Sequence, residues 1–354
     1  MKEWFEKKDY FERYQSVAVR RVMGGHSKTN ETPLVTVAIP AYKRTDLLKE
    51  AMESVLRQKG FSDYELIVVD NYAEDNPEMD ALMSAYTEKY PHIVYYKNEQ
   101  NIGMGGNWNR CIELAKGDWV VLLHDDDMLC ENYLKTAYPI AVKTGCTLLG
   151  TFSSQMNQLE RGETDVKYSR KLDRSKDILS RLRKGHAFEV KRNDLLHFIQ
   201  PSPGCWMIHK KANLMFGGYD AERKKSGLID GPFNFKNTWN GKTVIVPQFL
   251  FVRRIKENDF LNVEAQRDIL TGLYSYIRHY AETYTKCKKL NKWIVDISIL
   301  NFARGMKAKY KAEIDTARIL KEMGVSGWLL HMPDKVIYLL NMFGLGKLVF
   351  RKWL

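Results

Sequence analysis

Three consecutive aspartates, Asp125, Asp126 and Asp127, lie just beyond the apolar run from Trp119 to Leu123. The run is apolar on both faces and too short for an independent helix, which predicts a strand buried inside a sheet. Three carboxylates at the end of such a strand repel one another, and a divalent cation with oxygen ligands offsets that repulsion. A solvated acidic turn or a helix N-terminus is the plainer alternative, since aspartate is common in both. The triplet therefore predicts a cation site that other parts of the chain must support.

Apolar runs and helix-like segments alternate from residue 34 to residue 129. The β-rich run 34–40 ends in a polar turn, and the run 64–69 ends in Asp70. This alternation predicts an α/β fold with a mostly parallel sheet and right-handed crossovers. The carboxyl ends of parallel strands meet at one edge of the sheet, where open α/β sheets bind their ligands. We therefore expect Asp70 and the aspartate triplet to lie at that edge.

A glycine-rich stretch, residues 101–107, precedes a helix that we expect to begin at Trp108. The stretch matches neither the GxxxxGK[ST] phosphate loop nor the GxGxxG dinucleotide motif, and a tight turn is its plainest interpretation. It follows the strand-like run 93–96, so we expect this loop to reach the same edge of the sheet as the aspartates.

The chain has 354 residues and a net charge of +12, which favours acidic partners such as nucleotide phosphates, anionic lipid or nucleic acid. Its five cysteines have no framework or CxxC spacing, which indicates a reducing compartment and gives no support for zinc. The first residues lack the apolar core of a signal peptide, and no run of about 18 uncharged apolar residues predicts a spanning helix. We therefore expect a cytoplasmic protein.

We expect three regions: an N-terminal extension over residues 1–33, an α/β domain over 34–258 and a basic helical region over 259–354. Aromatic residues of the extension are expected to pack on the domain. Residues 155–195 are dense in charge and are expected to form an excursion. The final segment, 328–354, mixes large apolar residues with four basic residues and one aspartate. That composition is typical of an interfacial amphipathic helix, and equally of a helix packed on its own domain.

Taken together, these motifs resemble the family 2 glycosyltransferases over residues 34–252. Members of that family are inverting enzymes of the GT-A fold, a Rossmann-like sheet flanked by helices, and they use nucleotide-sugar donors. The run Val37–Tyr42 resembles the opening motif that cradles the base, and Asp70 matches the aspartate that reads the pyrimidine ring. The resemblance implies a donor-binding set of Pro40, Ala41, Tyr42, Arg44, Asp70, Gly103, Asn107 and Asp125.

The segment Leu123–Leu129 corresponds to the metal motif of the family, which reads Asp-x-Asp-Asp in most members. His124 takes the first position in this chain, which leaves Asp126 as the best candidate for direct metal ligation, with Asp127 beside it. Magnesium or manganese suits an oxygen-rich site of this kind. The resemblance therefore implies Mn²⁺ or Mg²⁺ as the cofactor.

Asp230, which follows the turn 217–220, matches the segment that carries the catalytic base of the family. The family usually shows Glu-Asp where this chain has Ile229 and Asp230. It also places a polar helix next, and we expect residues 231–235, which contain glycine and proline, to replace that helix. A carboxylate base at Asp230 would take the proton of an acceptor hydroxyl.

The expected function is transfer of a sugar from a nucleotide-sugar, with a UDP-sugar as the first expectation, to a hydroxyl of a glycan or lipid-linked acceptor. The setting would be surface-polysaccharide assembly, with the enzyme peripheral on the inner face of an anionic membrane. A nucleotidyltransferase is one alternative, although Lys43 and Arg44 are its sole early basic signature. A basic nucleic-acid-binding protein is another, but carboxylates gathered at the sheet edge would repel a phosphate backbone. We therefore expect no nucleic-acid partner.

Overall fold

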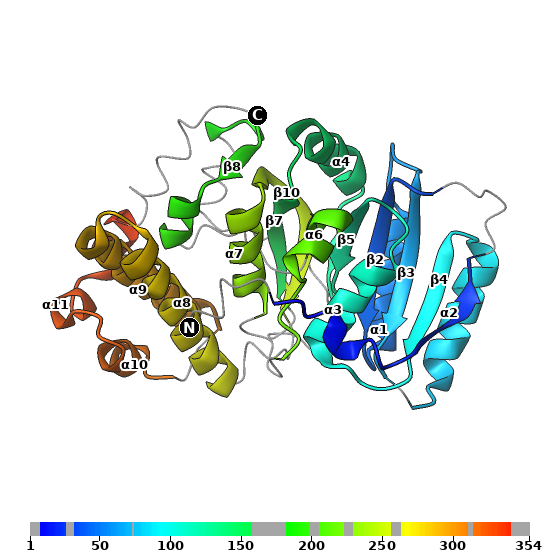
Figure 1. Ribbon diagram of the computed structural model, residues 1–354, viewed down its shortest axis with the longest axis horizontal. Helices are drawn as coiled ribbons and strands as arrows, with labels where there is room; N and C mark the ends of the chain where they lie inside the picture. The colour runs from blue at the N-terminus through cyan, green and yellow to red at the C-terminus, as the bar shows by residue number, and fades with distance from the viewer. Residues whose placement is uncertain are drawn as a thin grey trace.

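The computed structural model describes residues 8–25, 32–72, 74–157, 182–197, 205–222, 229–255, 263–310 and 314–340. A single sheet runs through the molecule with helices on both of its faces, and further helices gather at one end (Figure 1).

Four strands at the centre of the sheet run parallel: β2 (Val35–Ala41), β3 (Tyr64–Asp70), β4 (Ile93–Asn98) and β5 (Trp119–Leu123). They lie in the order β4-β3-β2-β5, and the register pairs Ala41 with Asp70 and Asp70 with Lys97. Strands β2 and β3 therefore end side by side, as the alternation of apolar runs and helices predicted. Strand β2 is buried along its whole length, which explains why its sequence is apolar apart from Thr36.

Six further strands extend this parallel centre: β1 (Val19–Gly24), β6 (Met128–Leu129), β7 (Leu148–Asn157), β8 (Phe188–Val190), β9 (Cys205–His209) and β10 (Thr243–Ile255). The full order is β1-β4-β3-β2-β5-β9-β7-β10-β6, with β8 paired to β10. Strand β1 pairs antiparallel with β4 and follows the short 3-10 helix η2 (Glu12–Tyr14). Part of the expected N-terminal extension is thus an edge strand of the sheet.

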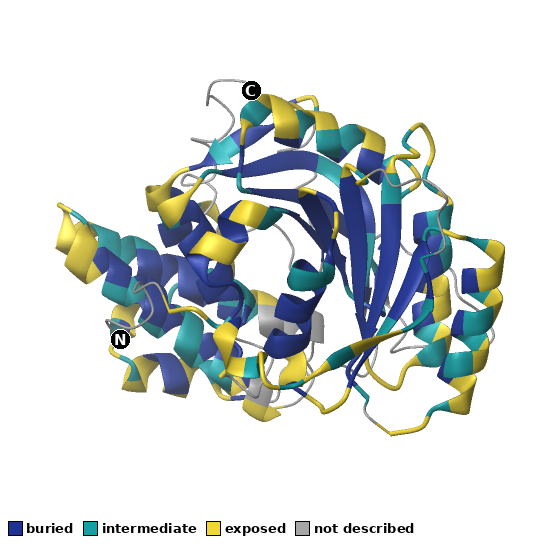
Figure 2. Ribbon diagram, turned by 45° about the vertical axis from the view of Figure 1, so that its right-hand side comes forward, coloured by how far each residue is buried: buried dark blue, intermediate teal, exposed yellow. Residues whose placement is uncertain are grey.

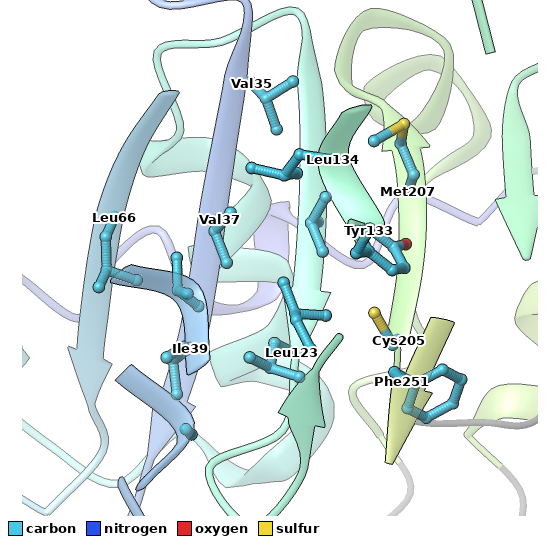
Figure 3. Packing of buried hydrophobic residues seen from close by; sticks show 14 of the residues in the cluster. Val35, Val37, Ile39, Leu66, Leu123, Tyr133, Leu134, Cys205, Met207 and Phe251 are labelled. Atoms are coloured by element: carbon cyan, nitrogen blue, oxygen red, sulfur yellow. The ribbon is translucent and has the colours of Figure 1, made fainter. Parts of the chain in front are cut away.

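One face of the sheet is covered by α1 (Thr45–Leu56), α2 (Pro77–Lys89) and α4 (Tyr133–Thr144). Val37 and Ile39 point to this face (Figure 3), because alternate residues of a strand point to the same side of the sheet. Leu48 of α1 belongs to the same buried cluster. Each fully buried side chain of this size contributes about 1.5–3 kcal/mol. The layer therefore holds the parallel strands in place beneath their carboxyl ends.

The opposite face is covered by α3 (Gly103–Leu114) and α7 (Asp230–Asn240), with α6 (Lys210–Phe216) in contact with both. Ala38 and Val120 point to this face and pack with Trp108 of α3 and Phe233 of α7. The two helices that cover this face begin at the carboxyl edge of the parallel strands or close to it (Figure 1).

Helix α3 begins at Gly103, so the expectation of a glycine-rich loop with a helix from Trp108 is wrong. The glycines serve close packing instead. A Cβ atom at Gly105 would lie 2.7 Å from the carbonyl oxygen of Asp220, and one at Gly106 would lie 2.9 Å from the ring of Tyr14. Tertiary contacts therefore override the low helix propensity of glycine in this first turn.

The C-terminal region is helical, as predicted, with α8 (Val263–Tyr284), α9 (Lys288–Tyr310), α10 (Thr316–Glu322) and α11 (Gly327–Leu330). These helices share one core with β8, the 3-10 helix η3 (Arg192–His197) and α7. Leu329 and Ile337 are fully buried in that core, so residues 328–340 pack on the rest of the chain along one face, while outward-facing residues stay exposed (Figure 2). Residues 341–354 lie outside the described part of the chain.

Within the described ranges, no helix is both long and apolar enough to cross a membrane.

Gly24 gives a test of how firmly the edge strand β1 is joined to the sheet. It has a φ of 80°, and a Cβ atom there would lie 2.1 Å from the carbonyl oxygen of Ile93. We expect Gly24→Ala to lower the free energy of unfolding by about 2–4 kcal/mol, because left-handed strain and a backbone clash add together.

Gly145 is the matched control, because it has a φ of 59° and no atom within 4 Å of its built Cβ. Gly145→Ala should cost about 1 kcal/mol, from left-handed strain without a clash. Urea unfolding of both variants measures the two losses. Equal losses would show that the close approach of Gly24 to β4 is unimportant.

Candidate functional site

The aspartate triplet lies in the turn between β5 and β6, at the carboxyl edge of the parallel strands. Asp125 and Asp127 are buried, and Asp126 is half-buried. Burial and neighbouring negative charge raise the pKa of Asp125 to about 7 and raise the pKa of Asp127 well above its usual range. The turn therefore concentrates acidic charge where solvation is poor, and it requires positive partners.

One positive partner is Arg44, which stands directly before α1. Its Nη1 donates to Oδ2 of Asp126 at 2.9 Å, and its Nε donates to Oδ2 of Asp125 at 3.2 Å. Its Nη2 also donates to Oδ1 of Asp125. The preceding residue, Lys43, has a φ of 64°, a left-handed conformation that residues other than glycine adopt at a cost. A strained turn at the end of β2 thus precedes the arginine that binds the triplet.

The second positive partner is Arg254, near the end of β10, which sequence reasoning did not identify. Its backbone N–H donates to Oδ1 of Asp127 at 2.9 Å, and its Nε donates to the carbonyl oxygen of Asp126 at 2.9 Å. Its Nη2 donates to Glu50 of α1 at 2.5 Å. The side chain of Arg254 is 2% exposed. Arg254 therefore fixes the backbone of the turn at Asp126 and the carboxylate of Asp127.

His124, Asp126 and Asp127 each offer one ligand atom, and these atoms lie within 4.8 Å of one another. Ligands of one small cation lie about 2.1 Å from it and so about 3–4 Å apart, which a small side-chain adjustment reaches. Carboxylate oxygens suit Mg²⁺ and Mn²⁺, whereas an imidazole nitrogen is a ligand of transition metals. The donor set therefore fits the expected cofactor, and the structure adds His124 to the predicted Asp126 and Asp127.

Asp70 lies at the end of β3 and is fully buried. Its Oδ2 accepts a hydrogen bond from the hydroxyl of Tyr95 at 2.9 Å, and its Oδ1 accepts one from the backbone N–H of Tyr72 at 2.9 Å. Burial raises its pKa despite these bonds. The base of a donor nucleotide can therefore contact Asp70, as predicted, only if it reaches past the side chains that bury this carboxylate.

Asn107, predicted to bind the donor, is buried within a network of asparagines. Its side-chain amide donates to the carbonyl oxygen of Val69 at 2.9 Å, and its Oδ1 accepts from Asn98 at 2.9 Å. Asn71 joins the network by donating to the carbonyl oxygen of Gly103 at 3.1 Å. The structure thus gives Asn107 a scaffolding position, from which it holds the start of α3 against β3.

The other predicted donor-binding residues lie at the ends of β2 and at the start of α3. Pro40 and Ala41 are buried, whereas Tyr42 and Gly103 are exposed. The ring of Tyr42 meets the ring of Tyr72 edge to face at 5.8 Å, and Nζ of Lys43 lies 4.4 Å from the centroid of Tyr72. The exposed ring of Tyr42 and the half-buried ring of Tyr72 form an aromatic surface beyond the ends of β2 and β3.

Asp230 is the first residue of α7, so the expectation that residues 231–235 replace this helix is wrong. Pro232 falls in the first turn, where proline is tolerated because its missing N–H would have no helical partner. Burial raises the pKa of Asp230 to about 7, against the opposing effect of the Arg253 charge. The charge of Arg253 also opposes the rise in the pKa of Asp127, so one guanidinium acts on both carboxylates.

A chain of aromatic rings connects the triplet to α7. The rings of His124 and Trp108 stack with centroids 4.8 Å apart, and Trp108 meets Tyr219 edge to face at 5.0 Å. Tyr219 stacks on Phe233 at 3.7 Å. Because these contacts are tightly packed, they set the position of the Asp230 helix relative to the aspartates.

A family model described as glycosyl transferase family 2 matches residues 36–214, which is just over half of the chain. An uncharacterized protein of Mycobacterium tuberculosis is 25% identical over 228 residues, covering 63% of this chain and 67% of its own length. WcaA of Escherichia coli, named for glycosyl transfer in colanic acid biosynthesis, is 32% identical over 102 residues, 29% of this chain and 36% of its own. The abequosyltransferase RfbV of Salmonella typhimurium is 28% identical over 155 residues, 40% of this chain and 46% of its own. The match thus spans less than half the length of WcaA and of RfbV.

Two solved structures share the fold. TarS 1–349 of Staphylococcus aureus, in complex with UDP-GlcNAc, matches with a TM-score of 0.57 and 16% identity over 89% of this chain and 88% of its own. The mannosyltransferase PcManGT of Pyrobaculum calidifontis, in complex with GDP-Man and Mn²⁺, matches with a TM-score of 0.54 and 14% identity over 98% and 91%. The predicted GT-A fold is thereby confirmed. Together with the family match, these findings show that the chain is a glycosyltransferase and belongs to glycosyl transferase family 2.

Proposed function

We propose that this glycosyltransferase moves a sugar from a nucleotide-sugar to a hydroxyl of a surface-polysaccharide acceptor, with a divalent cation and with inversion. The observation that carries the proposal is that the charge of Arg253 acts both on Asp127, a member of the cation-ligand set, and on a separate carboxylate, Asp230. Inverting transfer needs these two elements, because one group must stabilise the leaving diphosphate and another must activate the acceptor.

The donor side is assigned to the residues beyond the ends of β2 and β3. Tyr42 offers an exposed ring and Tyr72 a half-buried ring for a base, and Asp70 offers a carboxylate that accepts an N–H from it. The titles of the matched structures name UDP-GlcNAc for TarS and GDP-Man with Mn²⁺ for PcManGT, which supports a nucleotide-sugar as donor. A UDP-sugar remains the first expectation.

His124, Asp126 and Asp127 would hold the cation, with Mn²⁺ favoured over Mg²⁺ because of the imidazole. When bound, the cation supplies positive charge that offsets the negative charge growing on the leaving nucleoside diphosphate. Arg254 keeps the turn in place, because its backbone N–H and its guanidinium bind Asp127 and the carbonyl of Asp126.

Asp230 would act as the base that takes the proton of the acceptor hydroxyl. Its pKa of about 7 lies close to physiological pH, where a general base is both ionised and basic enough to accept a proton. Attack by that hydroxyl from the face opposite the leaving diphosphate inverts the configuration of the sugar. The name of WcaA, which refers to glycosyl transfer in colanic acid biosynthesis, supports a polysaccharide as the acceptor class.

The cation site is tested by Asp126→Asn. With Mn²⁺ and a panel of UDP- and GDP-sugars, we expect this variant to lose at least about a hundredfold in donor hydrolysis, because one charged ligand is removed. Glu131→Gln is the control, since Glu131 is an exposed carboxylate paired with Lys59 outside the cluster. Near-full, Mn²⁺-dependent turnover by Asp126→Asn would refute the site.

The role of Asp230 is tested by the pH dependence of Asp230→Asn. Because the folded state raises the pKa of Asp230 from its usual range to about 7, folding binds a proton and the stability of the wild type falls as pH rises from about 4 to 7. We expect the variant to be more stable than the wild type by about 1–3 kcal/mol at pH 8 and equal to it at pH 4.

The same substitution should lower the turnover rate, although it raises stability at pH 8. Wild-type kcat should rise with pH through about 7, and Asp230→Asn should lose both the rise and most of the rate. Urea unfolding at the two pH values and a pH–rate profile measure the two effects. A variant that keeps the wild-type profile would exclude Asp230 as the base.

We also propose that the C-terminal helices rest on an anionic membrane. Support comes from Trp328 and Leu339, which are 56% and 57% exposed while Leu329 and Ile337 beside them are fully buried. We expect the double substitution Trp328→Ser and Leu339→Ser to reduce co-sedimentation with anionic liposomes severalfold, because exposed apolar area drives interfacial binding. Val142→Ser is the control, since Val142 is 53% exposed on the distant helix α4. Equal binding by all forms would refute the membrane contact.

A further inference from the structure

We propose that Arg44 is an internal counter-ion that occupies the cation site until a nucleoside diphosphate arrives, and that it then transfers its contacts to the diphosphate. This inference rests on the proposed function. It adds the order of events at the site, in which Arg44 leaves the carboxylates when the nucleoside diphosphate binds. The cation and the nucleotide would bind cooperatively, because each one favours the displacement of Arg44 from the carboxylates.

The contacts of Arg44 overlap the predicted cation ligands. Nη1 donates to Oδ2 of Asp126 at 2.9 Å, and Asp126 is a member of the ligand set His124, Asp126 and Asp127. The guanidinium also spans both oxygens of Asp125 through Nε and Nη2. A divalent cation placed among these ligands would lie next to the guanidinium, and the two positive charges would repel each other.

Arg44, unlike Arg254, can leave the carboxylates of the turn. Its side chain is 45% exposed, and it donates hydrogen bonds to the carboxylates of Asp125 and Asp126. Arg254 is 2% exposed and is held by Glu50 and by the backbone of the turn, so it stays in place. The more exposed guanidinium therefore loses less when it swings outward, since water can solvate it.

A diphosphate gives the released arginine a new partner. Guanidinium groups bind phosphate oxygens through two parallel N–H donors, as they bind carboxylates. Arg44 also follows Tyr42 by two residues in the chain, and the exposed ring of Tyr42 belongs to the surface assigned to the base. The movement therefore keeps Arg44 on the donor side of the site while it frees Asp126 for the cation.

The test measures Mn²⁺ binding to the full chain without nucleotide, with free Mn²⁺ followed by electron paramagnetic resonance. Arg44→Met should bind Mn²⁺ about tenfold more tightly than the wild type, within the usual range of coupling between sites. Lys43→Met is the matched control. It removes the same charge one residue away, from an ammonium that lies over the rings of Tyr42 and Tyr72. It should change the affinity far less.

Two further measurements keep the proposal open to refutation. Arg44→Lys retains the charge but cannot span both carboxylates, so it should fall between the wild type and Arg44→Met, and it serves if the methionine variant does not fold. UDP or GDP should tighten Mn²⁺ binding by the wild type by about tenfold and by Arg44→Met much less.

Equal Mn²⁺ affinity in the wild type and Arg44→Met, or equal gains in Arg44→Met and Lys43→Met, would overturn the proposal. If Arg44→Met does not fold, an Arg44→Lys affinity equal to that of the wild type would overturn it too. These readouts do not depend on sugar transfer. A chain that shows the Arg44 effect but hydrolyses no nucleotide-sugar would refute the proposed function and leave this inference standing.

Discussion

The accumulation of like charge at the end of a buried strand is the constraint on which the rest of the site depends. Asp125 and Asp127 are buried beside Asp126, and their raised pKa values record the cost of that arrangement. Three arginines reduce the cost, namely Arg44, Arg253 and Arg254, and the fold brings them from segments far apart in the sequence. Arg44 follows the first parallel strand, and Arg254 lies near the end of β10. A protein retains such a cluster when a ligand gains from it, because a charged site that is poorly solvated binds cations strongly.

The layers around the sheet explain why this charge can be held in one place. Apolar side chains of β2 and β3 pack with α1, α2 and α4 on one face and with α3 and α7 on the other, so the strand ends have little freedom to separate. The aromatic chain from His124 to Phe233 then relates the Asp230 helix to the triplet. In the proposed mechanism, leaving-group stabilisation and proton removal fall to separate rigid elements, which suits chemistry that depends on position.

Sequence patterns predicted the parts of this site that depend on local periodicity. The apolar runs before Asp70 and before the triplet indicated buried parallel strands, and the edge that they share followed from the parallel arrangement. The start of α3 was missed because Gly105 and Gly106 lower helix propensity, whereas their contacts with Asp220 and Tyr14 come from distant segments. Arg254 was missed for a similar reason, since its partner Glu50 lies 204 residues earlier in the chain. Pro232 hid the start of α7, because a proline in the first turn of a helix resembles a break.

The most direct test of this account is calorimetric titration of the wild-type chain with UDP and with GDP, in Mn²⁺ and in EDTA. If the carboxylate cluster exists to hold a cation against a leaving diphosphate, at least one nucleotide should bind with Mn²⁺ and lose most of its affinity in EDTA. Added Mn²⁺ should restore the binding, and the substitution Asp126→Asn should abolish that restoration. Binding of equal strength in Mn²⁺ and in EDTA would contradict the account, because the triplet would then have no part in recognising the diphosphate.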